Sequence, residues 1–214
     1  MVQFKVLISL LLALELFGIH NPVLAQKASN KKMIIVIDPG HGGKDSGAVG
    51  VNGILEKDIV LKIAKEIVDL NETTFKNRFE IYLTRYKDTL ISLGDRTKLA
   101  KSLNADIFIS LHCNYSDNPN ARGLEVYVSK KQGKYSKESV LLAYDLQNGL
   151  KENIGFESRG VKFGDFQVIR ETTDYSPAVL LELCFLSHRG EVQHLTEEEN
   201  LFALGLSIFN WFTN

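Results

Sequence analysis

One short stretch constrains the fold of this chain more than any other. Met33 to Ile37 is an unbroken apolar run, and Asp38-Pro-Gly-His-Gly-Gly-Lys-Asp-Ser-Gly follows it directly. A short, β-branched run of this kind is typical of a strand that is buried on both faces. Asp-Pro-Gly cannot continue a central strand. The sequence therefore predicts that His41 lies on a tight loop at the carboxyl end of a buried strand, where open α/β sheets bind ligands.

The loop around His41 has three interpretations. A phosphate-binding loop of the Walker type requires glycine where this chain has Asp38 and serine or threonine where it has Asp45. A metal site suits the loop better, because neutral imidazole is a common metal ligand and carboxylates lie nearby. The third interpretation is an incidental histidine on a turn. The glycines on both sides of His41 disfavour it, because glycine lets another group approach closely.

The beginning of the chain resembles a secretory signal peptide. One positive charge precedes an apolar core over residues 6–17, and Val23-Leu-Ala offers small residues for cleavage. This core is shorter than the roughly 20 residues that a membrane-spanning helix needs. We therefore expect a signal peptide over residues 1–25, a short polar linker over 26–32 and a single domain over 33–214. Such a protein would be exported, to the periplasm or the cell exterior.

Composition excludes some classes of partner. The formal net charge of the 214 residues is -1, so no basic excess indicates binding to nucleic acid or to an anionic membrane. No second apolar span follows the signal segment. The two cysteines, Cys113 and Cys184, each lie in an apolar, strand-like segment. Export would permit a disulfide between them, but these segments favour two buried free thiols instead.

Strand and helix patterns alternate along the chain. Strands are predicted over residues 33–37, 79–84, 106–112, 123–129, 166–170 and 178–185, and helices over 56–70, 92–103 and 139–153. This alternation predicts an α/β fold with a mostly parallel sheet of five or six strands. The strand over 123–129 follows its predecessor too closely for a helical crossover, so we expect it to run antiparallel and to make the sheet mixed.

The last part of the chain predicts a loop and then a helix. His188 and His194 lie in a polar stretch that is typical of a solvated loop, and we assign neither a role. Thr196 and Glu199 have the spacing of a capping box, which predicts the start of the final helix. The apolar stripe of that helix includes Leu201, Leu204, Ile208 and Trp211.

Three residues form a candidate metal site. His112 ends the strand predicted over 106–112, so it lies on the same sheet edge as His41. Glu56 opens the first predicted helix, where a carboxylate also favours the helix dipole, so spacing leaves capping and metal ligation equally open. Two histidines and one glutamate would complete a catalytic zinc site with one position left for water.

Glu182 is an anomaly because it interrupts the apolar run over residues 178–186. An unpaired carboxylate in a buried strand costs several kcal/mol, so it must be protonated, paired or close to a cation. A structural interpretation pairs it with Arg85, Arg96 or Arg170. A functional interpretation makes it a general base with a raised pKa that activates water near a metal ion, and we favour this one.

These segments together resemble a known family. The sequence resembles the zinc-dependent N-acetylmuramoyl-L-alanine amidases of the amidase-3 type, in order over nearly all of residues 33–212. The similar segments are Asp38-Pro-Gly-His-Gly-Gly-Lys-Asp-Ser-Gly, Glu56-Lys-Asp, Leu83-Thr-Arg, Ser110-Leu-His-Cys-Asn, Gly123-Leu-Glu and Pro177-Ala-Val-Leu-Leu-Glu-Leu-Cys-Phe-Leu-Ser.

The resemblance implies a fold, a cofactor and a reaction. It implies a mixed, mostly parallel six-stranded sheet flanked by helices on both faces. It implies His41, Glu56 and His112 as ligands of Zn²⁺, and Glu182 as the general base and acid. The implied reaction uses metal-activated water to hydrolyse the amide between N-acetylmuramic acid and L-alanine in peptidoglycan. We expect a monomer that acts on peptidoglycan, with a protein activator as a further partner to be considered.

Substrate contacts are less specified. Arg85 and Arg96 could bind substrate carboxylates, but each is as well explained by a structural ion pair. Gly42, Gly43 and Asn114 are expected to shape the cleft.

The chain departs from the family pattern at three places. Cys113 and Cys184 stand where relatives often have alanine and glycine. Some relatives insert a helix that blocks the zinc site, whereas here only about ten residues, Lys130–Ser139, separate a strand from a helix, an ordinary connection. We therefore expect no built-in plug. Two rival functions remain: a non-catalytic wall-binding or activator module, and a zinc peptidase that cuts within stem peptides.

Overall fold

The computed structural model describes residues 31–51, 53–155 and 157–212. The expected signal peptide and nearly all of the expected linker lie outside these ranges. Within them, no helix combines the length and the apolar character needed to cross a membrane.

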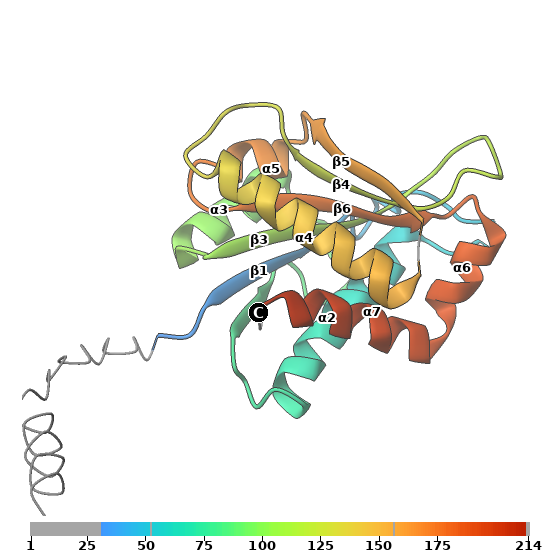
Figure 1. Cartoon of the computed structure of the whole chain (residues 1–214), viewed down its shortest axis with the longest axis horizontal. Helices are drawn as coiled ribbons and strands as arrows, with labels where there is room; N and C mark the ends of the chain where they lie inside the picture. The colour runs from blue at the N-terminus through green and yellow to red at the C-terminus, as the bar shows by residue number, and fades with distance from the viewer. Residues whose placement is uncertain (1–30, 52, 156, 213–214) are drawn as a thin grey trace, which may run out of the picture. The chain divides into compact units, whose positions relative to one another are not determined.

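A six-stranded mixed sheet forms the centre of the domain (Figure 1). The strand order is β2-β1-β3-β6-β4-β5. Every neighbouring pair is parallel except β4 and β6, which are antiparallel, so the predicted mixed, mostly parallel sheet is confirmed. The strands are β1 (Ile34–Pro39), β2 (Glu80–Leu83), β3 (Ile107–Asn114), β4 (Leu124–Ser129), β5 (Ser158–Gly164) and β6 (Ala178–Phe185).

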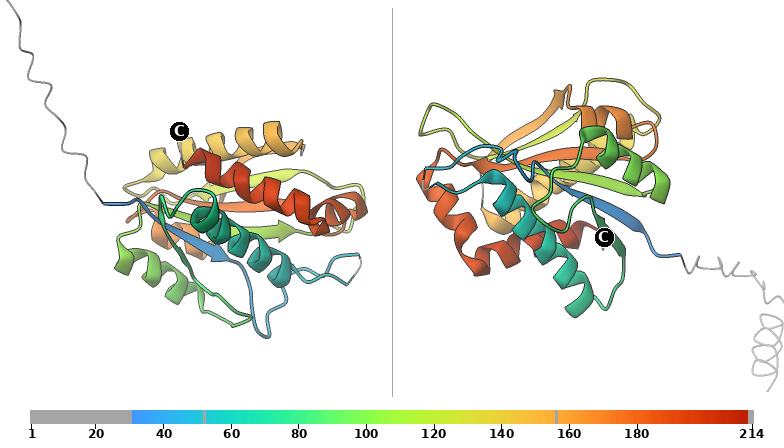
Figure 2. Two further views of the ribbon diagram at one scale, coloured as in Figure 1. Left: turned by 90° about the horizontal axis from the view of Figure 1, so that it is seen from below. Right: turned by 180° about the vertical axis from the view of Figure 1, so that it is seen from behind.

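Helices cover both faces of the sheet, as predicted (Figure 2). One face packs against α2, α4 and α7, and the other against α3 and α5. The helices are α2 (Glu56–Thr73), α3 (Leu93–Leu103), α4 (Ser136–Ile154), α5 (Gln167–Thr172), α6 (Arg189–Thr196) and α7 (Glu198–Trp211).

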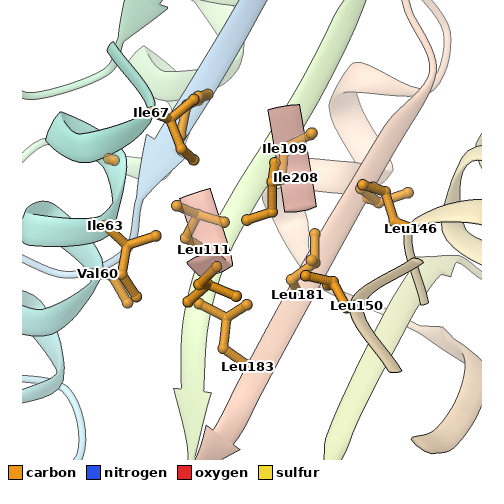
Figure 3. Packing of buried hydrophobic residues seen from close by; sticks show 14 of the residues in the cluster. Val60, Ile63, Ile67, Ile109, Leu111, Leu146, Leu150, Leu181, Leu183 and Ile208 are labelled. Atoms are coloured by element: carbon orange, nitrogen blue, oxygen red, sulfur yellow. The ribbon is translucent and has the colours of Figure 1, made fainter. Parts of the chain in front are cut away.

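The larger core lies between the sheet and α2, α4 and α7 (Figure 3). Alternate residues of the central strands, such as Ile109 and Leu111, point into this core and meet Ile63 and Ile208 from the helices. Burial of one such side chain contributes about 1.5–3 kcal/mol. Because the central strands are buried on both faces, their sequences read as continuous apolar runs. This packing holds the carboxyl ends of β1, β3 and β6 in fixed positions.

Two elements near residue 165 differ from the prediction. The prediction of a strand over residues 166–170 is wrong, because residues 167–172 form helix α5. A short apolar run does not distinguish strand from helix, and here Val168, Ile169 and Thr172 are buried at helical spacing. The sequence also missed β5. This polar strand lies at the sheet edge, where it pairs with β4 only.

The segment around His188 also differs from the prediction. It was expected to be a solvated loop but forms helix α6, for which the His188 ring accepts a hydrogen bond from the Glu191 backbone N–H at 3.2 Å. Glu191 is buried, and its carboxylate accepts hydrogen bonds from the backbone N–H groups of Gly123 and Phe185. Thr196 therefore ends α6, and the final helix begins at Glu198. The side chain of Trp211 lies outside the part of the chain that the structure describes.

Candidate metal centre

Three side chains converge at the carboxyl edge of the sheet. His41 follows β1, Glu56 is the first residue of α2, and His112 lies near the carboxyl end of β3. Glu56 Oε1 lies 3.0 Å from His41 Nε2 and 2.9 Å from His112 Nδ1. One ligand atom from each of the three lies within 4.8 Å of the others. The structure therefore brings together all three residues that the sequence suggested as metal ligands.

Glu56 is buried and has several partners. Its carboxylate accepts hydrogen bonds from the backbone N–H groups of Cys113, at 3.0 Å, and of Ala48, at 2.8 Å. Burial would raise the pKa of Glu56, but hydrogen bonds with His112 and His41 outweigh it and hold the pKa well below its usual range. The side chain is therefore ionised, which is the form that binds metal. Its hydrogen bonds point into the site, so capping of α2 does not explain its position.

His41 is held by a carboxylate that the sequence argument did not assign. Asp45 Oδ2 lies 2.9 Å from His41 Nδ1, while His41 Nε2 faces Glu56. Burial would lower the pKa of His41, but Glu56 and Asp45 outweigh it and raise the pKa to about 8. A carboxylate on the second ring nitrogen is the usual partner of a metal-binding imidazole, because it orients the ring. The available signal was a carboxylate four residues after a histidine within one tight loop.

Two glycines make room for these side chains. A Cβ atom at Gly40 would overlap the ring of His112, and one at Gly47 would overlap both Glu56 and His41. Gly47 also has a φ of 63°, a conformation that other residues rarely adopt. The glycines around His41 therefore allow these side chains to approach one another closely.

Arg96 lies beneath the loop and makes the structural ion pair that was the alternative to substrate binding. It is 2% exposed, and its Nη1 lies 2.6 Å from Asp38 Oδ1. It also donates to the carbonyl oxygens of Pro39 and His41. The carboxylate of Asp38 in turn accepts a hydrogen bond from the hydroxyl of Ser110. Arg96 thus positions the loop that carries His41.

Arg85 has a related role. It is 3% exposed and donates to the carbonyl oxygens of Pro39, Gly40 and Lys57. These bonds fasten the loop after β1 to the first turn of α2. Because its donors are engaged by the backbone, Arg85 holds two ligand-bearing segments together and is not presented to a substrate.

Glu182 lies on β6 directly beside His112 of β3 in the sheet register. Its Oε2 atom is buried and has no hydrogen-bond partner among the described residues. Burial raises the pKa of Glu182 to about 7, and the negative charges of Glu56 and Glu125 add to this, against the opposing effect of His112. A carboxyl with this pKa is suited to exchange protons near neutral pH.

The alternative that paired Glu182 with an arginine is wrong. Arg85 bonds to backbone carbonyls, Arg96 pairs with Asp38, and Arg170 pairs with Asp165 at 2.6 Å. The position of Glu182, whose Oε2 atom is buried, is therefore explained by the site and not by a structural ion pair.

A cleft of about 680 Å³ opens beside the three ligands. Much of its wall is apolar. It is lined by Asp38, Gly40, His41, Asp45, Leu90, Ile91, Ser92, Leu93, Asp95, Arg96, His112, Phe166, Gln167, Val168, Leu180 and Glu182. Gly42 and Gly43 shape the turn of the loop, since Gly42 bridges to Asp45. Asn114, which was expected to shape the cleft, lies outside this lining, and its amide donates to Glu125 at 3.4 Å.

Both cysteines are buried free thiols, as the favoured interpretation predicted. Cys113 on β3 is hydrogen-bonded to Cys184 on β6, and this bond together with burial raises the pKa of the Cys113 thiol well above its usual range. The two thiols therefore act as small packing residues below the site.

The donor set fits Zn²⁺. Two imidazole nitrogens and one ionised carboxylate oxygen are the protein ligands of many catalytic zinc sites, which leave one position open. The carboxylate of Asp45 on His41 supplies the outer partner that such sites require. Glu182, whose Oε2 atom has no hydrogen-bond partner in the part of the chain that the structure describes, neighbours His112 in the sheet.

Known proteins share this chain's sequence and fold. A family model described as Amidase_3, N-acetylmuramoyl-L-alanine amidase, matches residues 35–212. The N-acetylmuramoyl-L-alanine amidase LytC of Bacillus subtilis is 37% identical over 179 residues, which make up 84% of this chain and 33% of LytC. The chain thus spans about a third of the length of that relative.

Solved structures agree with the family match. The catalytic domain of CwlV, an N-acetylmuramoyl-L-alanine amidase from Bacillus (Paenibacillus) polymyxa, has a TM-score of 0.75 and 36% identity, with 85% of this chain and 96% of that domain covered. The CwlD amidase of Clostridioides difficile, solved in complex with the GerS lipoprotein, has a TM-score of 0.74 and 27% identity, covering 84% and 95% of the two chains.

The converged residues His41, Glu56, His112 and Glu182 all lie inside the matched segment. Because the family model covers residues 35–212, well over half of the sequence, the chain belongs to the Amidase_3 family of N-acetylmuramoyl-L-alanine amidases.

Proposed function

We propose that this chain is a zinc-dependent N-acetylmuramoyl-L-alanine amidase that hydrolyses the amide between N-acetylmuramic acid and L-alanine in peptidoglycan. The observation that carries the proposal is the convergence of His41, Glu56 and His112 beside Glu182, whose Oε2 atom has no hydrogen-bond partner among the described residues. The similarity to the amidases LytC, CwlV and CwlD supports the same reaction.

His41, Glu56 and His112 would hold the metal ion. When bound, Zn²⁺ lowers the pKa of water and polarises a carbonyl oxygen. Glu182 takes the proton from the attacking water and later delivers it to the leaving amine of L-alanine. Its raised pKa of about 7 suits both transfers. Asp45 keeps the His41 ring oriented, and Arg85 and Arg96 fix the loop that carries it.

The cleft is proposed to be open to substrate without removal of a built-in plug. The link between β4 and α4 runs over residues 130–135 and contains no helix. A connection of this length is ordinary between a strand and a helix. A structure of the loaded enzyme with a residue of its own chain in the open position would overturn this part of the proposal.

The first test is digestion of purified peptidoglycan by residues 26–214, followed by mass spectrometry of the soluble products. We expect free stem peptides that begin at L-alanine, released only when zinc is present and lost in saturating chelator. Release that persists in chelator would contradict the metal requirement. Shortened stem peptides still attached to muramic acid would instead establish the rival function, a zinc peptidase.

The second rival is a non-catalytic wall-binding or activator module. A module of that kind needs no intact catalytic set, whereas His41, Glu56, His112 and Glu182 are all present and adjacent. Binding of peptidoglycan by a zinc-loaded protein that releases no product, in the presence of candidate partners, would favour this rival.

Location and partners follow from the proposed substrate. Export by a signal peptide over residues 1–25 would bring the enzyme to its substrate in the periplasm or outside the cell. The complex of CwlD with the GerS lipoprotein supports the idea that a protein partner activates this chain as well. In the absence of such a partner, we propose a monomer.

A further inference from the structure

A second polar cluster adjoins Glu182 on the β4 side, across Glu182 from His112 of β3. Glu125 on β4 is the direct partner of Glu182 in the antiparallel pairing of β4 and β6, so both side chains lie on the same face of the sheet. We call Glu125, together with Asn114, Tyr127, Arg159 and Lys162, the Glu125 cluster. Arg159 and Lys162 come from the edge strand β5, the strand that the sequence missed.

Glu125 is the buried centre of this cluster. It is 3% exposed, and its Oε1 atom lies 2.6 Å from Arg159 Nε and 2.6 Å from Lys162 Nζ. Its Oε2 atom accepts a hydrogen bond from the hydroxyl of Tyr127 at 2.7 Å. Burial would raise the pKa of Glu125, but the bonds from Lys162, Tyr127 and Arg159 outweigh it and leave the pKa below its usual range. Glu125 is therefore ionised and fixed.

The cluster carries more positive charge than its structural role requires. One carboxylate is shared by two cations, so Glu125, Arg159 and Lys162 together have a net charge of one positive unit. A single cation would neutralise Glu125. Two long cationic side chains fixed on one buried carboxylate lose less conformational freedom when they bind a further anion.

Both cations remain accessible. The side chains of Arg159 and Lys162 are 39% and 36% exposed. Arg159 packs over the ring of Phe185, with its guanidinium carbon 5.1 Å from the ring centroid, and Lys162 lies over the ring of Tyr127. The guanidinium of Arg159 also donates to the carbonyl oxygen of Arg122 at 3.3 Å.

We propose that Arg159 and Lys162 bind a carboxylate of the peptide part of the substrate, an acidic peptide that extends across β4 and β5. This inference rests on the proposed amidase function and names the substrate class that the site prefers. The peptide leaves Glu182 toward the sheet edge, while the apolar cleft that Glu182 also lines receives the remainder of the substrate.

Dimensions of the sheet indicate which carboxylate can reach the cluster. Neighbouring strands are about 4.8 Å apart, so β5 lies about 10 Å from Glu182, and Arg159 and Lys162 reach back from it to Glu125 on β4, which lies about one spacing from Glu182. An extended peptide advances roughly 3.5 Å per residue. The carboxylate that reaches Arg159 and Lys162 therefore belongs to the second or third residue after the cleaved amide.

The test compares four synthetic muramyl tripeptides of identical length, with a free carboxylate or a carboxamide on the second and on the third residue. For the zinc-loaded enzyme, we expect kcat/KM to be about tenfold higher for a peptide with a free carboxylate at one of these positions, as one charge-assisted hydrogen bond implies. Lys162→Gln should remove most of this preference, because it lowers hydrolysis of the free acid and leaves hydrolysis of the amide nearly unchanged.

Lys162→Gln retains Arg159 as the partner of buried Glu125, so the fold should persist. Thermal unfolding and zinc content would verify this. The matched control is Lys131→Gln, which removes an exposed lysine paired with Asp174 outside the cleft and the Glu125 cluster. It should leave both the rate and the preference unchanged. Arg159→Lys should retain part of the preference.

The outcomes separate this inference from the proposed function. A wild-type enzyme that cleaves all four peptides equally well would overturn the carboxylate site and leave the amidase function standing. Equal losses on acid and amide in Lys162→Gln would show a purely structural cluster and would also overturn it. A zinc-loaded protein that cleaves none of the peptides and no peptidoglycan would contradict the amidase function itself.

Discussion

Two carboxylates in the same site, Glu56 and Glu182, have pKa values shifted in opposite directions. Glu56 is bonded by two imidazole rings and two backbone N–H groups, which favour its ionised form. Glu182 is half-buried, and its Oε2 atom is buried without a hydrogen-bond partner among the described residues, which favours its protonated form. Groups whose environments separate their pKa values in this way are suited to different tasks, here metal binding and proton transfer.

The raised pKa of Glu182 predicts a pH-dependent stability in chelator-treated protein. Its pKa rises from about 4.5 in the unfolded chain to about 7 in the folded one, so ionisation destabilises the fold as pH increases from 4.5 to 7. Glu182→Gln removes this effect. The variant should exceed wild type in free energy of unfolding by about 3 kcal/mol at pH 8 and differ little at pH 4.

Urea denaturation at the two pH values would measure this difference. Glu72→Gln, at an exposed position on α2, is the control and should change little at either pH. A stability difference for Glu182→Gln that is the same at pH 4 and pH 8 would contradict the assigned pKa.

Close packing at Gly40 gives a second prediction at the residue scale. A methyl group at this position would overlap the His112 ring without introducing a positive φ, so Gly40→Ala tests packing and not backbone strain. We expect zinc affinity to fall about 10- to 100-fold, as it does when the surroundings of a ligand are disturbed. Gly94→Ala has open space around the added atom and should bind zinc normally, as measured by competition with a chromophoric chelator.

At the scale of elements, the site depends on how the loop after β1 is fastened. The loop lies between two buried arginines, of which Arg96 comes from α3 and Arg85 from the segment after β2. The sequence predicted both elements but left the roles of the arginines open. Only the fold reveals that their donors face the carbonyl oxygens of residues 39–41.

Loss of the buried ion pair between Arg96 and Asp38 should destabilise the domain. Arg96→Ala leaves Asp38 buried without its charged partner, which typically costs about 3–5 kcal/mol. The surface pair of Arg170 and Asp165 provides the control, and Arg170→Gln should cost less than about 1 kcal/mol. Equal effects of the two substitutions on the urea midpoint would contradict the structural role given to Arg96.

Helices and strands were predicted correctly where the local pattern of apolar residues was strong. The buried strands β1, β3 and β6 and the amphipathic helix α2 were predicted from apolar runs and helical spacing. The edge strand β5 was missed because its apolar alternation is limited to Val161 and Phe163, and pairing with β4 stabilises it. Helix α5 is only six residues long, too short for its period to be read from the sequence.

At the scale of the whole molecule, the topology gathers the site. The adjacent strands β1, β3 and β6 deliver His41, His112 and Glu182 to one edge of the sheet, and the helix that follows the β1 loop returns Glu56 to the same point. The histidines and Glu182 were predictable because they end or interrupt buried strands. Asp45 and the Glu125 cluster were not, because their roles depend on contacts between distant segments.

We propose that Glu182 performs proton transfer in a zinc site made by other residues. The most direct test measures the turnover of Glu182→Gln on peptidoglycan at a zinc content matched to wild type. We expect zinc to be retained at one ion per chain, since Glu182 is not a ligand, and turnover to fall about 10²- to 10⁴-fold. Turnover close to that of wild type would contradict the role of Glu182, and loss of the zinc would contradict its separation from the ligand set.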